Sequence, residues 1–155
     1  MRIQRIYLET SVFNFVFADD APEKKADTLK LFEEIKAGKY LPFASVYVSD
    51  ELNLASEPKR SQMLGLIRQY GIEILPDNTE AERLAGAYVA EGIIPAKYLT
   101  DAKHIASASV AGLDVVVSWN FKHIVKLKTI RLTEVVNLKE SYKRILINSP
   151  TEVID

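Results

Sequence analysis

The stretch Gly112-Leu113-Asp114-Val115-Val116-Val117 decides the fold class of this chain. Val115 to Val117 are consecutive β-branched residues, which favour extended backbone. A strand with one solvated face alternates apolar and polar side chains, whereas this run is apolar at every position. It is therefore typical of a strand buried on both faces, in the centre of a parallel sheet between two layers of helices. Gly112 ends the helix that precedes it.

Outward from this strand, short apolar segments alternate with segments of helical spacing. Strands are predicted at residues 6–8, 40–44 and 72–75, with an edge strand at 145–147. Helices are predicted from Pro22 to Gly38 and at residues 46–55, 60–70, 79–90 and 100–112, with a terminal helical turn from Pro150. The pattern predicts a three-layer α/β/α sandwich with a central, mostly parallel sheet of four to five strands. Residues 132–143 show a mixed pattern.

Local signals add detail to this pattern. The apolar residues Ala26, Leu29, Phe32 and Ile35 recur at helical spacing and predict one buried face. Thr79 and Glu82 have the spacing of a capping box, and Thr100 is a candidate cap for the helix that follows it.

Length and composition limit the possible classes of protein. With 155 residues and 48% hydrophobic residues, the chain is expected to form one domain, residues 1–155. The net charge of -1 gives no global basic field, so a nucleic-acid site must be local. The absence of cysteine excludes disulfides and thiolate metal sites. We find no signal peptide and no apolar run long enough to span a bilayer, and we expect a cytoplasmic protein with no membrane partner.

Three carboxylates follow or flank the predicted strands. Glu9 follows the first strand, Glu51 lies in the helix after the second, and Asp101 begins the helix before Val115 to Val117. Ligands of open parallel sheets bind beyond the carboxyl ends of the strands, where these acids can converge. Clustered like charges repel unless a cation neutralises them, and Mg²⁺ or Mn²⁺ suits an oxygen-rich site.

Each acid also has an ordinary structural interpretation. Glu9 can be a solvated charge at a strand end, Glu51 a residue of the helix surface, and Asp101 a first-turn acid that the helix dipole favours. Asp50 points about 100° away from Glu51 around a helix, so the two do not readily face the same metal.

Four segments resemble motifs of the PIN domain family, in particular the VapC-like toxins and their relatives. They are Tyr7-Leu8-Glu9-Thr10-Ser11-Val12-Phe13-Asn14, Ser45 with Glu51 six residues later, Thr100-Asp101-Ala102-Lys103-His104-Ile105-Ala106, and Ser118-Trp119-Asn120-Phe121-Lys122-His123-Ile124. The third is the most specific match. Ser149-Pro150-Thr151-Glu152 is a fainter fifth match. The resemblance spans residues 6–124 and rests on the order and spacing of the segments.

The resemblance implies a ribonuclease that binds Mg²⁺ or Mn²⁺ and hydrolyses RNA phosphodiester bonds. The toxin of a type II toxin-antitoxin pair is one form that such a ribonuclease takes in this family. It implies Glu9, Glu51 and Asp101 as metal ligands, direct or through water, and Asn120 as a fourth catalytic position. Thr10, Ser11 and Asn14 are candidates for orienting Glu9 or the phosphate. An antitoxin partner and a homodimer are expected on the same grounds.

Two residues depart from the family pattern. Glu9 stands where the family usually has Asp, and its extra methylene moves the carboxylate by about 1 Å. Asn120 stands where many relatives carry a fourth acid, and it offers an oxygen without charge. The alternative function is therefore a catalytically weak or inactive PIN-like domain that binds RNA or a protein partner. A phosphotransfer receiver domain is a third reading, for which the sequence lacks a suitably placed lysine.

Basic and aromatic residues after the fourth strand are candidates for binding RNA. Lys122, His123, Lys126, Lys128 and Arg131 form the densest basic stretch, which is either a phosphate-binding surface or an ordinary solvated one. For Trp119, Phe121, Tyr7 and Phe13, core or dimer packing is the better interpretation than base stacking. His104 and His123 are expected to be neutral residues that pack beside the fourth strand or hydrogen-bond to backbone.

Overall fold

A computed structural model describes residues 2–155 as an α/β domain around one five-stranded sheet. All neighbouring strands are parallel, in the order β3-β2-β1-β4-β5. The strands are β1 (Gln4–Leu8), β2 (Tyr40–Ser45), β3 (Glu73–Leu75), β4 (Val115–Val117) and β5 (Leu146–Asn148). The predicted fold class, a layered α/β domain with a parallel sheet of four to five strands, is confirmed.

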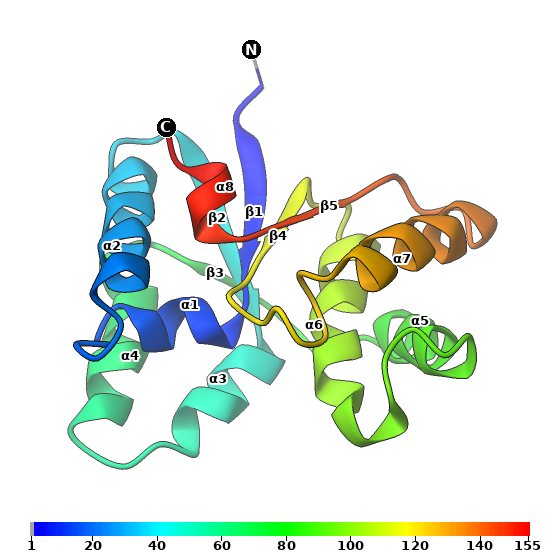
Figure 1. Cartoon of the computed structure of the whole chain (residues 1–155), viewed down its shortest axis with the longest axis horizontal. Coiled ribbons are helices and arrows are strands. Elements are labelled where there is room, and N and C mark those ends of the chain that lie inside the picture. Colours follow the sequence, from blue (N-terminus) through cyan, green and yellow to red (C-terminus); the bar gives the residue numbers. More distant parts are fainter. Residues whose placement is uncertain (1) are drawn as a thin grey trace.

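Helices cover both faces of the sheet (Figure 1). They are α1 (Thr10–Phe15), α2 (Pro22–Lys36), α3 (Val46–Asn53), α4 (Lys59–Gln69), α5 (Thr79–Ala90), α6 (Leu99–Val110), α7 (Leu127–Lys139) and α8 (Pro150–Val153), with a 3-10 turn at Ala96–Tyr98. In Figure 1, α2 and α4 lie on one side of the sheet and α5, α6 and α7 on the other. Within residues 2–155, no helix combines the length and apolar character that a bilayer-spanning segment requires.

The two central strands, β1 and β4, are the most deeply buried part of the sheet. Ile6, Tyr7 and Leu8 pair with Val115, Val116 and Val117, and at most 7% of any of these six residues is exposed. Apolar side chains on both faces of these strands contact the two helix layers, as the uninterrupted valine run predicts. The carboxyl ends of β1 and β4 therefore lie in the middle of the sheet edge.

Three local predictions are wrong. Asn78, and not Thr79, caps α5, because its side chain accepts hydrogen bonds from the N–H groups of Glu80 and Ala81. Helix α6 begins at Leu99 without a side-chain cap, so Thr100 already lies inside the helix. Leu29 is 41% exposed, because the buried face of α2 runs through Leu31, Phe32 and Ile35 instead.

Residues 132–139 of the segment with a mixed pattern belong to a helix, α7. Three of its four buried residues are polar, whereas Val135 and Leu138 are 60% and 78% exposed; the buried residues are Thr129, Thr133, Val136 and Asn137. Asn137 hydrogen-bonds Tyr88 and Ser109 within the helix layer, which satisfies its buried amide. The polar side of this helix therefore faces inward, opposite to the usual arrangement, and hides its periodicity.

Candidate metal centre

Glu9 is a buried carboxylate at the carboxyl end of the central strand β1. It is 5% exposed and occupies the N-cap position of α1. Its Oε1 accepts hydrogen bonds from Ser118 Oγ at 2.5 Å and Ser11 Oγ at 2.6 Å. Ser118 directly follows β4, so the pairing of β1 with β4 brings both hydroxyls to the same carboxylate. The two hydroxyls fix the orientation of the carboxylate from one side.

Glu51 reaches the same place from helix α3. Its Oε1 accepts hydrogen bonds from Thr10 Oγ1 at 2.5 Å and is 2.6 Å from His104 Nε2. Burial alone raises the pKa of Glu51, but the hydrogen bond and charge of His104 and the Thr10 hydroxyl lower it below its usual value. Glu51 is thus held in its charged form beside Glu9.

His104 is fully buried on helix α6 and connects the site to the sheet. Its Nδ1 is 2.6 Å from Tyr7 Oη, which is in turn 2.6 Å from Ser45 Oγ. Burial lowers the pKa of His104, but the contact with Glu51 and the charges of Glu9 and Asp101 raise it above its usual value. Of the two interpretations that the sequence left open, hydrogen bonding to backbone is wrong, because His104 contacts side chains at both ring nitrogens, and burial against the sheet remains.

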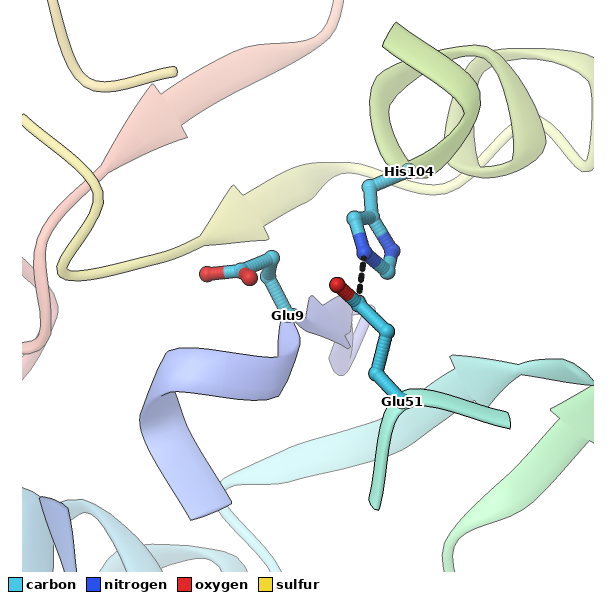
Figure 2. A group of neighbouring side chains, drawn as sticks. All are labelled: Glu9, Glu51 and His104. Atoms are coloured by element: carbon cyan, nitrogen blue, oxygen red, sulfur yellow. Dashed lines mark hydrogen bonds and ion pairs between the residues drawn. The ribbon is translucent and has the colours of Figure 1, made fainter. Parts of the chain in front are cut away.

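Glu9, Glu51 and His104 form one group whose ligand atoms lie within 4.8 Å of one another. Figure 2 shows the carboxylates of Glu9 and Glu51 with the imidazole of His104 beside them. The sequence offered a signal for His104, since it follows Asp101 by three residues on one helix and therefore shares its face.

Asp101 lies one turn before His104 and is partly buried. Burial and the charge of Glu9 raise the pKa of Asp101, and the charges of His104 and His123 with a hydrogen bond from Asn120 only partly oppose this. Asp101 shares a face of α6 with His104 but is not one of the three residues whose ligand atoms lie within 4.8 Å of one another. The side chain of Asn120 is also engaged at its oxygen, which accepts the His123 N–H at 2.9 Å.

The remaining predicted site residues have different surroundings. Thr10 and Ser11 contact the carboxylates, as described, whereas Asn14 donates its amide to the Thr10 carbonyl one turn earlier at 3.2 Å. Lys122 is exposed, and its Nζ lies 5.7 Å from the centre of the Tyr98 ring. The His123 imidazole stacks on the same ring with centroids 4.0 Å apart.

Aromatic residues near the site have mainly structural roles. Trp119 is 7% exposed and donates its indole N–H to Thr28 Oγ1 at 2.9 Å. Tyr7 and Phe13 are fully buried, so core packing is confirmed for these three residues. Phe121 is 48% exposed, with its ring centre 6.1 Å from that of Trp119 and 5.3 Å from Lys24 Nζ.

The acids lack basic partners. Among residues 2–155, neither Glu9 nor Asp101 forms an ion pair with lysine or arginine, and Glu51 pairs only with His104. A cleft of about 430 Å³ opens beside Glu51 and is lined by three more acids, Asp50, Asp77 and Glu82, and by one base, Lys103. Negative charge thus extends from the buried group to the surface, and carboxylate oxygens are the donors that Mg²⁺ and Mn²⁺ prefer. The residues present fit such an ion.

Comparisons with known proteins identify relatives by structure and not by sequence. No protein-family model matches the chain, and no curated protein sequence does either. The chain is similar to a chain in the crystal structure of VapBC2 from Rickettsia felis bound to a DNA fragment from their promoter. The TM-score is 0.57 at 13% identity, covering 94% of this chain and 98% of that chain.

A second solved structure is a member of the VapBC family of toxin-antitoxin systems, VapBC-5, from Mycobacterium tuberculosis. It matches with a TM-score of 0.45 and 21% identity, over 75% of this chain and 85% of that chain. The agreement of fold rests on the first structure, which covers nearly all of both chains. The PIN-like fold expected from the sequence motifs is thereby confirmed: this chain shares its fold with the chain that it matches in the VapBC2 structure.

Proposed function

We propose that this protein is a Mg²⁺- or Mn²⁺-dependent ribonuclease that hydrolyses phosphodiester bonds of RNA. The observation that carries the proposal is the meeting of Glu9 and Glu51 with His104 at the strand ends, with Asp101 one turn before His104 on the same helix. Among residues 2–155, no lysine or arginine forms an ion pair with these three acids. A divalent cation offsets such charge, and the PIN-like fold is the appropriate setting for it.

In this proposal the metal ligands are Glu9, Glu51 and Asp101, directly or through water. A bound Mg²⁺ or Mn²⁺ supplies positive charge that draws the phosphate in and offsets the charge developing on its oxygens. The protein contributes orientation, because Ser11 and Ser118 fix Glu9. Hydrolysis adds the oxygen of one water molecule to phosphorus and breaks one P–O ester bond, and the leaving oxygen takes up a proton.

Asn120 and the residues after it are proposed to serve the substrate. Asn120 lowers the pKa of Asp101 and is proposed to orient that carboxylate toward the substrate. Lys122 is exposed two residues further on and is suited to a phosphate contact. Thr10, Ser11, Asn14 and His123 complete the proposed substrate-side set, of which Thr10 and Ser11 act through the carboxylates that they hold.

Partners are proposed on the same grounds. The VapBC2 structure concerns a toxin-antitoxin system, so we expect an antitoxin protein for this chain as well. We also propose a homodimer, which the exposed apolar residues Leu127, Val135 and Leu138 on α7 support. An RNA substrate implies action in the cytoplasm.

The test is cleavage of total cellular RNA, with sequencing of the new ends, combined with calorimetric titration of Mn²⁺. Asp101→Asn is expected to abolish both metal binding and cleavage, and chelation by EDTA is expected to stop the unmodified protein. Asp50→Asn is the matched control, because Asp50 is an exposed acid next to Glu51 on the same helix. Cleavage that persists in EDTA, or in Asp101→Asn, would rule out the proposed mechanism.

One observation favours a second candidate, an RNA- or protein-binding domain without turnover. The Asn120 oxygen accepts the His123 N–H, so the position at which many relatives carry an acid contributes no charge and has its oxygen engaged. Retention of RNA on the purified protein without new ends, in the presence of saturating Mn²⁺, would favour this alternative.

A further inference from the structure

A chain of buried hydrogen bonds runs from the sheet to the carboxylate of Glu51. Ser45, Tyr7 and His104 are each 0% exposed. Consecutive contacts join Ser45 Oγ to Tyr7 Oη, Tyr7 Oη to His104 Nδ1, and His104 Nε2 to Glu51 Oε1, each at 2.6 Å. Buried polar groups without partners are costly, so every hydrogen in this chain must have an acceptor.

Glu51, the acceptor at the end of this series of hydrogen bonds, determines which nitrogen of the His104 imidazole carries a hydrogen. A charged carboxylate can only accept hydrogen bonds, and Glu51 Oε1 faces His104 Nε2. Nε2 must therefore carry a hydrogen, both in the neutral imidazole and in its doubly protonated form. A nitrogen that carries a hydrogen has no lone pair left for a metal ion.

Tyr7 and Ser45, at the other end of the series of hydrogen bonds, determine how the His104 ring is held. In neutral His104, Nδ1 is a bare acceptor, and the single hydrogen of the Tyr7 hydroxyl points to it. The Ser45 hydroxyl then donates to the Tyr7 oxygen, while its own oxygen accepts the Tyr47 N–H at 3.2 Å. All four groups are satisfied with hydrogens that point in one direction, from Ser45 to Glu51.

We infer that His104 is a positioning residue and not a metal ligand, and that Tyr7 and Ser45 hold it so that its Nε2–H fixes Glu51 Oε1. Thr10 donates to the same oxygen, so the second oxygen of Glu51 is left for the cation. The inference rests on the proposed metal-dependent function. It assigns roles to Tyr7, Ser45 and His104 that the carboxylate cluster by itself does not.

Two measurements on the full chain test the inference. The first is long-range ¹H–¹⁵N NMR of the imidazoles in metal-free protein, where His123→Gln assigns the signals because the chain has only 2 histidines. A hydrogen on Nε2 of His104 is expected, and the tautomer with hydrogen only on Nδ1 would overturn the inference. This measurement needs no metal and no RNA.

The second measurement is calorimetric Mn²⁺ binding to Tyr7→Phe, which keeps the buried ring and removes the hydroxyl. Loss of such a supporting hydrogen bond is expected to weaken Mn²⁺ binding by about 10- to 100-fold. Tyr40→Phe is the control. The Tyr40 hydroxyl donates to the Val153 carbonyl, and Tyr40 begins β2, the strand that ends at Ser45. The Mn²⁺ affinity of this variant is expected to match that of the unmodified protein.

The outcomes separate this inference from the proposed function. Equal Mn²⁺ affinity in Tyr7→Phe and the unmodified protein would overturn the inference and leave the function standing. A directly coordinated nitrogen in the pulsed EPR spectrum of the Mn²⁺-loaded protein would do the same. If the unmodified protein bound no Mn²⁺, the proposed function would fail, while NMR would still decide the hydrogen-bond chain. Ser45→Ala, which removes the first donor, replaces Tyr7→Phe if that variant does not fold.

Discussion

Replacing Asp101 by asparagine is expected to stabilise the metal-free protein while abolishing its stabilisation by Mn²⁺. Burial and the charge of Glu9 raise the pKa of Asp101, so the folded protein holds the proton of this group more tightly than the unfolded chain does. Above that raised pKa, the ionised carboxylate opposes folding. Asparagine has nearly the same shape and removes the charge.

The magnitude follows from the like-charge repulsion that the substitution removes. Between charges that solvent partly screens, such repulsion costs about 1 kcal/mol, or about 2–4 °C in Tm for a chain of this size, and Asp101 is only partly buried. Mn²⁺ at a hundred times its Kd adds about 2.7 kcal/mol to the unmodified protein and nothing to the variant, so the order of stability reverses.

The assay is thermal unfolding of both proteins in EDTA and in Mn²⁺, from pH 3 to pH 7. The advantage of Asp101→Asn in EDTA is expected to shrink as the pH falls through the raised pKa of Asp101, and to vanish below its unfolded value of about 3.9. Asp50→Asn is expected to change stability by less than about 0.5 kcal/mol in either buffer. If Asp101→Asn were no more stable than the unmodified protein in EDTA at pH 7, the reasoning from charge repulsion would be refuted.

Three further predictions concern other parts of the molecule. Burial raises the pKa of Asp114, but hydrogen bonds from Arg2 and Lys143 lower it far below its usual value. Asp114→Asn is therefore expected to lower the free energy of unfolding in urea by about 2 kcal/mol at pH 7. This difference is expected to decline only as the pH falls below about 3.9. Lys122→Ala is expected to reduce the slope of log affinity for RNA against log salt by about 1 in fluorescence anisotropy, and an unchanged slope would exclude a phosphate contact. Val135→Lys is expected to shift the proposed dimer to a folded monomer in light scattering, because Val135 is 60% exposed and the lysine disturbs no core contact. A persistent dimer would place the interface elsewhere.

The strands could be predicted from the sequence because runs of consecutive apolar, β-branched residues indicate them directly. The valine run predicted a strand buried on both faces, and β4 is that strand, at the centre of the sheet beside β1. The acids could be found for a related reason, since they follow or flank strands, and parallel strands end at one edge. Helix α7 escaped prediction because its buried side is polar, which only its contacts with Tyr88 and Ser109 make favourable.

The sequence by itself determined the alternation of strands and helices, the parallel sheet and the positions of Glu9, Glu51 and Asp101 along it. Tertiary structure alone decided the partners of these acids. His104 and Glu51 are 53 residues apart in the chain, and no periodicity predicts that their side chains meet. Only the packing of α3 and α6 over the ends of β1 and β4 brings them together, because a hydrogen bond depends on distances of a few tenths of an ångström that residue spacing does not specify.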